Sequence, residues 1–208
     1  TKETLLLLVM TALLLCVVIS IGIQFAFVPP NLNPKLFSFL IWVVFLFSST
    51  VSIGRSFEYE LKNCALDGLL LTGVAPSIIY FSKFITTSSA CVVSHLVATL
   101  ALSTLLNVTL SDAVGGFLLV SLLIILGYNS LATLLSAITV RSRLRGLLLP
   151  LILIPLLFPL LFSAIELSNQ AIVGGALDFS SVWFSLLLGF DVIYFALALN
   201  LFGFTVRD

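Results

Sequence analysis

Six runs of apolar residues, each long enough to cross a lipid bilayer, constrain this chain more than any other feature. A bilayer core requires about 20 apolar residues per helix, and a spanning segment must satisfy its backbone polar groups internally. Of the 208 residues, 61% are hydrophobic and 9% are charged, whereas a soluble domain is about 25% charged. The sequence therefore predicts an all-α integral membrane protein with six transmembrane helices, at residues 5–28, 36–53, 84–106, 114–140, 147–165 and 182–206.

The first run, residues 5–28, has no small-residue cleavage pattern, so it is interpreted as a span and not as a signal peptide. No segment recurs at a fixed period, and no Pro/Gly/Ser-rich linker divides the chain. We therefore expect residues 1–208 to form a single transmembrane domain.

Basic residues are concentrated at one set of predicted helix ends, and cytoplasmic loops carry the excess of Lys and Arg. Only Lys35 lies on the other side. An even number of spans also places both termini on one side, so we predict that both termini are cytoplasmic, together with segment 55–83 and loop 141–145. The basic residues on this side are Lys2, Arg55, Lys62, Lys83, Arg141, Arg143, Arg145 and Arg207.

The segment between the second and third spans is polar and amphipathic. Six charged residues lie in it, so it is expected outside the hydrocarbon. We predict a helix on the cytoplasmic face that contacts a partner, and the alternative is a solvated helix that lies on the lipid surface alone. The charged residues are Arg55, Glu58, Glu60, Lys62, Asp67 and Lys83.

Motifs for catalysis are missing from the sequence. It contains no G-x-x-x-x-G-K-[ST] phosphate loop, no H-E-x-x-H and no G-x-S-x-G. Cys16, Cys64 and Cys91 have no metal-ligand spacing and are interpreted as small buried residues. Nine basic and nine acidic residues balance, which gives no indication of a nucleic-acid partner. We predict that the chain is not an enzyme and binds no metal. A membrane-bound transferase is the alternative of another class, but Asp67 followed by Gly68 is poor support for it.

Two readily ionisable side chains lie inside the predicted spans, His95 in the third and Asp191 in the sixth. Such groups face the bundle interior or a partner and not lipid. Both are placed at similar depth, about 15 to 18 Å from the outer surface at 1.5 Å per residue. One hypothesis is a paired polar site on a substrate path. The other is that His95 hydrogen-bonds a neighbouring hydroxyl and Asp191 makes a packing contact.

The fifth span contains Pro150, Pro155 and Pro159, each of which removes a backbone donor and clashes with the preceding turn. We expect a kink there, either as a bending element of a transporter or because prolines are frequent in membrane helices. Small residues also gather in three spans, where they favour close packing, with a polar translocation path as the alternative. They are Ser48, Ser49, Thr50, Ser52, Thr86, Thr87, Ser88, Ser89, Ala90, Ser130, Thr133, Ser136 and Ala137.

The segment from residue 55 to residue 83 resembles the membrane subunit of the cytochrome c maturation transporter, haem exporter protein B. That family shows R-x-F-x-x-[DE]-x-x-[DN] after the second span, then a Leu-rich stretch and a Lys. Asp67 stands where the family has Glu, and Cys64 and Ala65 replace a Gly and a small hydroxyl residue. The matching residues are Arg55, Phe57, Glu60, Asn63, Leu66, Leu69, Leu70, Leu71 and Lys83.

Residues 135–159 resemble the junction between the family's fourth and fifth spans, with its basic loop and proline-rich helix, and residues 190–206 resemble its C-terminal part. Thr87 and Ser88 stand where the family often has a His-Trp pair. His95 is therefore not the family's histidine.

The resemblance implies a type-2 ABC transporter permease in a bacterial-type inner membrane, with a cytoplasmic coupling helix between spans 2 and 3. It implies three kinds of partner: separate ABC ATPase subunits, a second haem-handling membrane subunit and a periplasmic haem chaperone. The chain itself would bind no cofactor and ATP would bind the partner, where its hydrolysis would drive either haem export, with haem as the substrate, or release of the haem chaperone. Rivals are a permease for a lipid, polysaccharide or drug, and a non-transporting assembly subunit. The implied ATPase-binding residues are Arg55, Phe57, Glu58, Glu60, Lys62, Asn63, Leu66, Asp67, Leu70 and Lys83, beside a basic loop of Arg141, Arg143 and Arg145.

Overall fold

The computed structural model describes residues 2–62, 75–110, 114–139 and 145–207. All regular structure in these ranges is helical, and six helices are long and apolar enough to cross a membrane, which confirms the predicted number of spans. The elements are α1 (Lys2–Phe25), the 3-10 turn η1 (Pro30–Leu32), α2 (Asn33–Lys62), α4 (Pro76–Leu106), α5 (Val114–Thr139), α6 (Arg145–Gly174) and α7 (Val182–Arg207).

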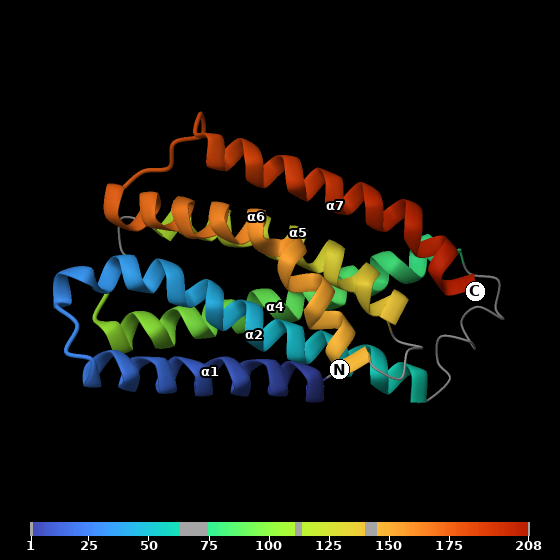
Figure 1. The fold of residues 1–208 in the computed structure, drawn as a ribbon, viewed down its shortest axis with the longest axis horizontal. Coiled ribbons are helices and arrows are strands. Elements are labelled where there is room, and N and C mark those ends of the chain that lie inside the picture. The colour runs from blue at the N-terminus through green and yellow to red at the C-terminus, as the bar shows by residue number, and fades with distance from the viewer. Residues whose placement is uncertain (1, 63–74, 111–113, 140–144, 208) are drawn as a thin grey trace.

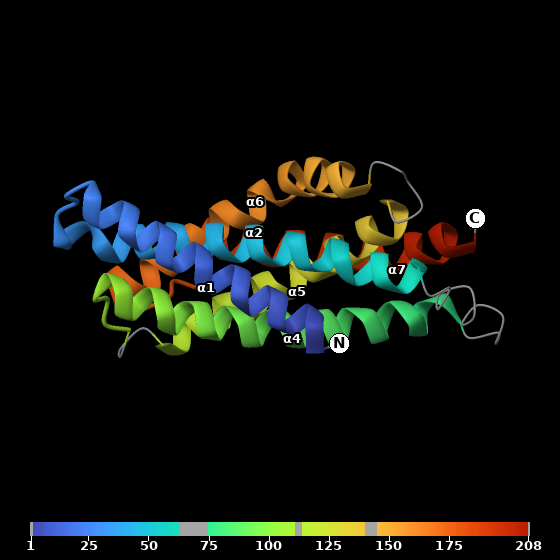
Figure 2. The ribbon, with the colours of Figure 1, turned by 90° about the horizontal axis from the view of Figure 1, so that it is seen from below.

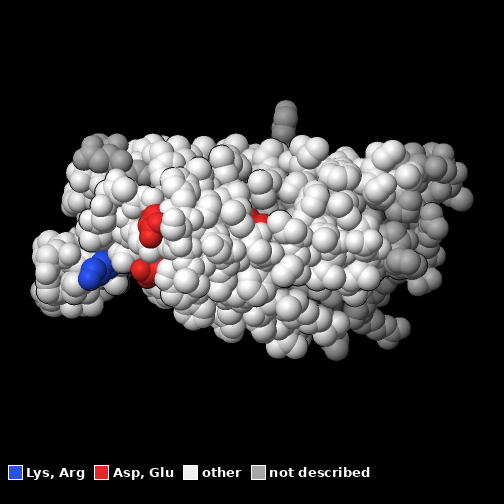
Figure 3. Space-filling view, turned by 90° about the horizontal axis from the view of Figure 1, so that it is seen from above, with Lys and Arg blue, Asp and Glu red and all other residues white. Residues whose placement is uncertain are grey.

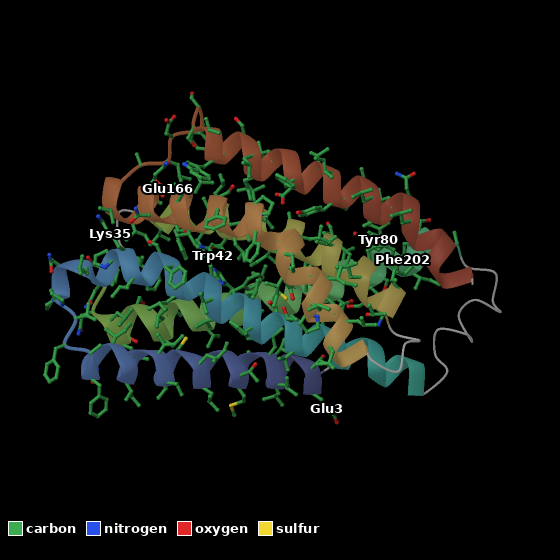
Figure 4. The ribbon with its side chains drawn as sticks, viewed as in Figure 1. Glu3, Lys35, Trp42, Tyr80, Glu166 and Phe202 are labelled. Atoms are coloured by element: carbon green, nitrogen blue, oxygen red, sulfur yellow. The ribbon has the colours of Figure 1, made fainter. Side chains whose placement is uncertain are left out.

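Both chain ends lie at the same end of the bundle, as an even number of spans requires (Figure 1). We call this the basic end, because the described helix termini found there include Lys2, Lys62, Arg145 and Arg207. The opposite end carries the connections from α1 to α2 and from α6 to α7. Lys35 lies near that opposite end, as Figure 4 shows.

Helix α5 lies at the centre of the bundle. It contacts α2, α4, α6 and α7, while α1 packs on the other side against α2 and α4. Buried residues make up 72% of the membrane-length window of α5 but 17% of that of α7. Figure 2 shows α1 and α6 on different sides of the bundle. Because α7 is mostly exposed, its outer face is available for lipid, and Figure 3 shows few charged atoms on the face that α7 covers.

The end of α4 is built from groups that satisfy free helical carbonyls. Asn107 adopts a left-handed conformation with φ of 52°, and its N–H donates to carbonyls of the last turn. Asn tolerates this conformation better than most residues. The Asn33 side chain donates from Nδ2 to the carbonyl of Leu106 at 2.8 Å. This bond ties the beginning of α2 to the end of α4 at the opposite end of the bundle.

Three helix boundaries differ from the sequence prediction by eight residues or more. Helix α2 continues nine residues past Ile53 to Lys62, and α4 begins at Pro76, eight residues before the predicted start of the third span. Proline suits the first turn of a helix because its missing N–H needs no partner there. Helix α6 continues to Gly174, so Glu166 lies in a helix and not in a loop. In α2 and α6, polar residues extend a spanning helix beyond its apolar run.

Helix α6 remains one helix through all three of its prolines, Pro150, Pro155 and Pro159. Figures 1 and 2 show that its direction changes along its length, which confirms the predicted kink. A proline cannot donate to the carbonyl four residues earlier, so the helix bends where these bonds are missing. The bend separates the basic half of α6 from the half that ends at Gly174.

Candidate functional site

The predicted coupling segment begins as a direct continuation of the second membrane helix. Helix α2 passes without interruption from its membrane-length stretch, which ends at Ile53, to Lys62. Nine residues at about 1.5 Å each extend the helix by about 13 Å. Residues 55–62 of the predicted segment therefore belong to the same helix as the second span. The predicted residues on this extension are Arg55, Phe57, Glu58, Glu60 and Lys62.

Two more of the predicted residues lie in described helices, one from the coupling segment and one from the basic loop. Lys83 lies in the second turn of α4, where its side chain is partly buried. Arg145 is the first residue of α6. The other predicted residues of the segment and of the basic loop lie outside the described residues, namely Asn63, Leu66, Asp67, Leu70, Arg141 and Arg143.

His95 lies in a stack of aromatic rings between α2, α4 and α5. Its ring is 4.9 Å from that of Trp42 and 6.0 Å from that of Phe117, with interplanar angles of 22° and 19°. Phe45 meets it edge-on at 5.5 Å. His95 Nε2 lies 3.1 Å from the Ser121 hydroxyl. His95 is 3% exposed, and with aromatic side chains packed around it the imidazole acts as a polar member of the core.

Asp191 points from α7 toward the backbone of α5. A Cβ built at Gly127 would overlap Asp191 Oδ1 and would lie 3.0 Å from its Cγ and 3.3 Å from Leu160 Cδ2. The Oδ1 atom is buried and has no hydrogen-bond partner among the described residues. Gly127 therefore makes room for a carboxylate where α5, α6 and α7 meet.

The structure gives His95 and Asp191 different neighbours. His95 contacts Ser121 of α5, whereas Asp191 contacts Gly127. Six residues separate these two positions on α5, which corresponds to about 9 Å along the helix. The contact with Ser121 is of the kind that the packing hypothesis expects for His95.

Two hydrogen bonds between helices had no signal in the sequence. The Trp42 indole N–H donates to the Ser168 hydroxyl at 2.8 Å, which joins α2 to the part of α6 that ends at Gly174. The Tyr194 hydroxyl donates to the carbonyl of Leu156, in the proline-rich part of α6. Both are side chains whose partners depend on helix register, which hydropathy does not determine.

A pocket of about 400 Å³ lies at the opposite end, between the end of α1, the beginning of α2 and the end of α4. Three amide side chains reach its lining, those of Gln24, Asn33 and Asn107, and the rest is mostly apolar. Over the described part of the chain, no group of three or more His, Cys, Asp or Glu side chains could hold a metal ion.

A search of curated proteins and a search of solved structures each found no match to this chain. The family model described as CcmB protein matches residues 2–207, nearly the whole chain. This match agrees with six membrane-length helices and with the resemblance seen around residues 55–83. The chain therefore belongs to the CcmB protein family, the haem exporter permease components of cytochrome c maturation.

Proposed function

We propose that this chain couples ATP hydrolysis by a separate ATPase subunit to a movement of its membrane helices during cytochrome c maturation. The observation that carries the proposal is the unbroken passage of α2 from the membrane into the charged segment that ends at Lys62. A force applied to this extension acts on the whole of α2, because a continuous helix transmits displacement along its axis.

The ATPase would dock at the basic end, which lies in the cytoplasm in this proposal because Lys and Arg are enriched in cytoplasmic loops. The docking residues would be Arg55, Phe57, Glu58, Glu60 and Lys62 on α2, Lys83 on α4, and Asn63, Leu66, Asp67 and Leu70 between them. The basic loop with Arg141, Arg143 and Arg145 would lie beside this surface.

Haem is the substrate class that fits the family, and a second haem-handling membrane subunit and a periplasmic haem chaperone are the further partners we propose. His95 is the one histidine of the chain. Since this side chain is 3% exposed and its Nε2 lies 3.1 Å from the Ser121 hydroxyl, we do not assign haem ligation to it. In this proposal ATP binds the partner subunit and no cofactor resides in this chain.

Reversing the acidic charges of the docking surface tests the proposal. Glu60→Lys with Asp67→Lys should lower the amount of ATPase that co-purifies by at least about tenfold, because breaking a buried interfacial charge pair costs about 2–5 kcal/mol. Glu166→Lys, at the opposite end of the bundle (Figure 4), is the matched control and should leave association unchanged. Undiminished association of the double variant would contradict docking at this surface.

A second measurement separates transport coupling from assembly alone. In membranes that contain the whole complex, we expect the double variant to reduce both ATP turnover and the yield of haem-loaded c-type cytochromes. If cytochrome yield falls while ATPase association and ATP turnover remain normal, the coupling role is wrong and an assembly role is supported.

A further inference from the structure

Three buried hydroxyl groups on α4 and α5 have no hydrogen-bond partner among the residues that the structure describes. They are the side-chain oxygens of Ser88, Thr133 and Ser136. The three residues are 8%, 0% and 2% exposed. A buried hydroxyl without a partner loses about 1–3 kcal/mol of hydrogen bonding, so buried polar groups in proteins are nearly always paired with protein or with ordered water.

These hydroxyls differ from their neighbours in the same helices. Ser and Thr inside helices usually donate to a carbonyl three or four residues earlier. Thr139 donates to Leu135 O at 2.8 Å, and Ser130 donates to Leu126 O at 2.9 Å. Thr133 and Ser136 lie between Ser130 and Thr139 on α5, yet neither hydroxyl makes such a bond. Their hydroxyls are therefore available to a partner other than their own helix.

The three groups belong to facing surfaces of the two helices. Cys91 of α4 lies 3.7 Å from Asn129 Oδ1 of α5, which fixes where the helices meet. Thr133 and Ser136 follow Asn129 by four and seven residues, the spacing of one helix face. Ser88 precedes Cys91 by three residues, and since consecutive spans run in opposite directions, it lies at about the level of Thr133.

This surface lies inside the membrane, near the basic end. Thr133 precedes the last residue of α5, Thr139, by six residues, which is about 9 Å along the helix. Neither lipid nor bulk water reaches a residue that is 0% exposed. A bound water molecule needs two to four polar partners, and three hydroxyls on one surface supply them.

We propose that Ser88, Thr133 and Ser136 form a water-binding site between α4 and α5, inside the membrane and in the half nearest the basic end. The ligand class is water or a small neutral molecule that both donates and accepts hydrogen bonds, because the lining offers hydroxyls and no charge. The site does not depend on the proposed coupling to an ATPase.

The sign of a stability change tests the site. Thr133→Val keeps the side-chain shape and removes the hydroxyl. If the hydroxyl binds water, the variant should unfold at a temperature about 2–4 °C lower, as expected for a lost buried hydrogen bond in a chain of this size. If the hydroxyl is unpaired, the same change should raise the unfolding temperature. The matched control is Thr139→Val, whose hydroxyl bonds only its own helix and which should change the temperature little.

Infrared spectroscopy of an introduced thiol would then test whether the partner of the Thr133 hydroxyl is water. In a background in which the three native cysteines are replaced by Ala, Thr133→Cys would be compared with Ala132→Cys. Ala132 is a fully buried neighbour of Thr133 on the same helix. The Thr133→Cys thiol should exchange S–H for S–D in D₂O at least about tenfold faster. Equal exchange rates, or a Thr133→Val variant no less stable than Thr139→Val, would overturn the proposal.

Discussion

The contact between Gly127 and Asp191 predicts a large effect from a single methyl group. In Gly127→Ala the added Cβ would overlap Asp191 Oδ1 and would also lie 3.0 Å from Cγ and 3.3 Å from Leu160 Cδ2. The carboxylate must move, although it is packed among three helices. Overpacking of this kind costs about 1–3 kcal/mol, while replacing a helical Gly by Ala returns up to about 1 kcal/mol.

A glycine on the partner helix isolates the steric cost. No atom lies within 4 Å of a Cβ built at Gly189, so Gly189→Ala gains helix propensity alone. The two variants should therefore differ by the overpacking energy of about 1–3 kcal/mol. At about 2–4 °C per kcal/mol for a chain of this size, their unfolding temperatures in detergent should differ by about 2–12 °C, with Gly127→Ala the lower.

A double variant assigns the cost to the carboxylate. Asp191→Ala removes Cγ and both carboxylate oxygens, so combining it with Gly127→Ala should restore most of the lost stability. Asp191→Asn keeps the same shape and should not restore it. The interaction energy of the Gly127→Ala and Asp191→Ala pair should be at least about 1 kcal/mol. If Gly127→Ala is as stable as Gly189→Ala, or if Asp191→Asn rescues it as well as Asp191→Ala does, the steric explanation is refuted.

Three further contacts between helices can be tested by substitution and thermal unfolding of the purified chain. Ser168→Ala should cost about 1–3 kcal/mol because it leaves the Trp42 indole N–H buried without an acceptor, and the cost should shrink when Trp42→Phe is also present. Tyr194→Phe should cost about 0.5–1.5 kcal/mol through loss of the bond to the Leu156 carbonyl. His95→Phe should be tolerated much better than His95→Ala, since a phenyl ring preserves the aromatic stack and Ala leaves a cavity. An equal cost for these two His95 variants would contradict the stacking role.

Hydropathy was sufficient to predict the number of spans, because each span must bury about 20 apolar residues. An even number of spans predicted a common side for the termini, and the structure brings both termini to one end. Helix ends were less predictable. Polar residues such as Glu166 were placed outside the predicted fifth span, which ended at residue 165. In the structure they continue α6 by more than two turns to Gly174. The glycine with φ of 73° that follows, Gly175, was the better signal for that boundary.

Contacts between helices could not be predicted from the sequence. Trp42 and Ser168 are 126 residues apart, and nothing in their local sequences links them. Whether an Asp meets a Gly or a His depends on the rotation and the axial position of each helix, which an apolar run of uniform hydropathy leaves undetermined. The pairing of His95 with Asp191 was one arrangement that equal depth allowed, and depth alone does not fix the contacts that form.

The contacts of α6 indicate how a displacement at the basic end would spread if an ATPase docks there. Helix α2 is bound to α6 by Trp42 and Ser168, on the side of the prolines away from the basic end. Tyr194 binds α7 to Leu156, within the proline-rich part. Because the bend lies between the basic end of α6 and Ser168, the part of α6 near the basic end can change direction while the part that ends at Gly174 stays joined to α2. A push on the extension of α2 should therefore open or close the bundle mainly at the basic end, with the contact between Trp42 and Ser168 as the pivot.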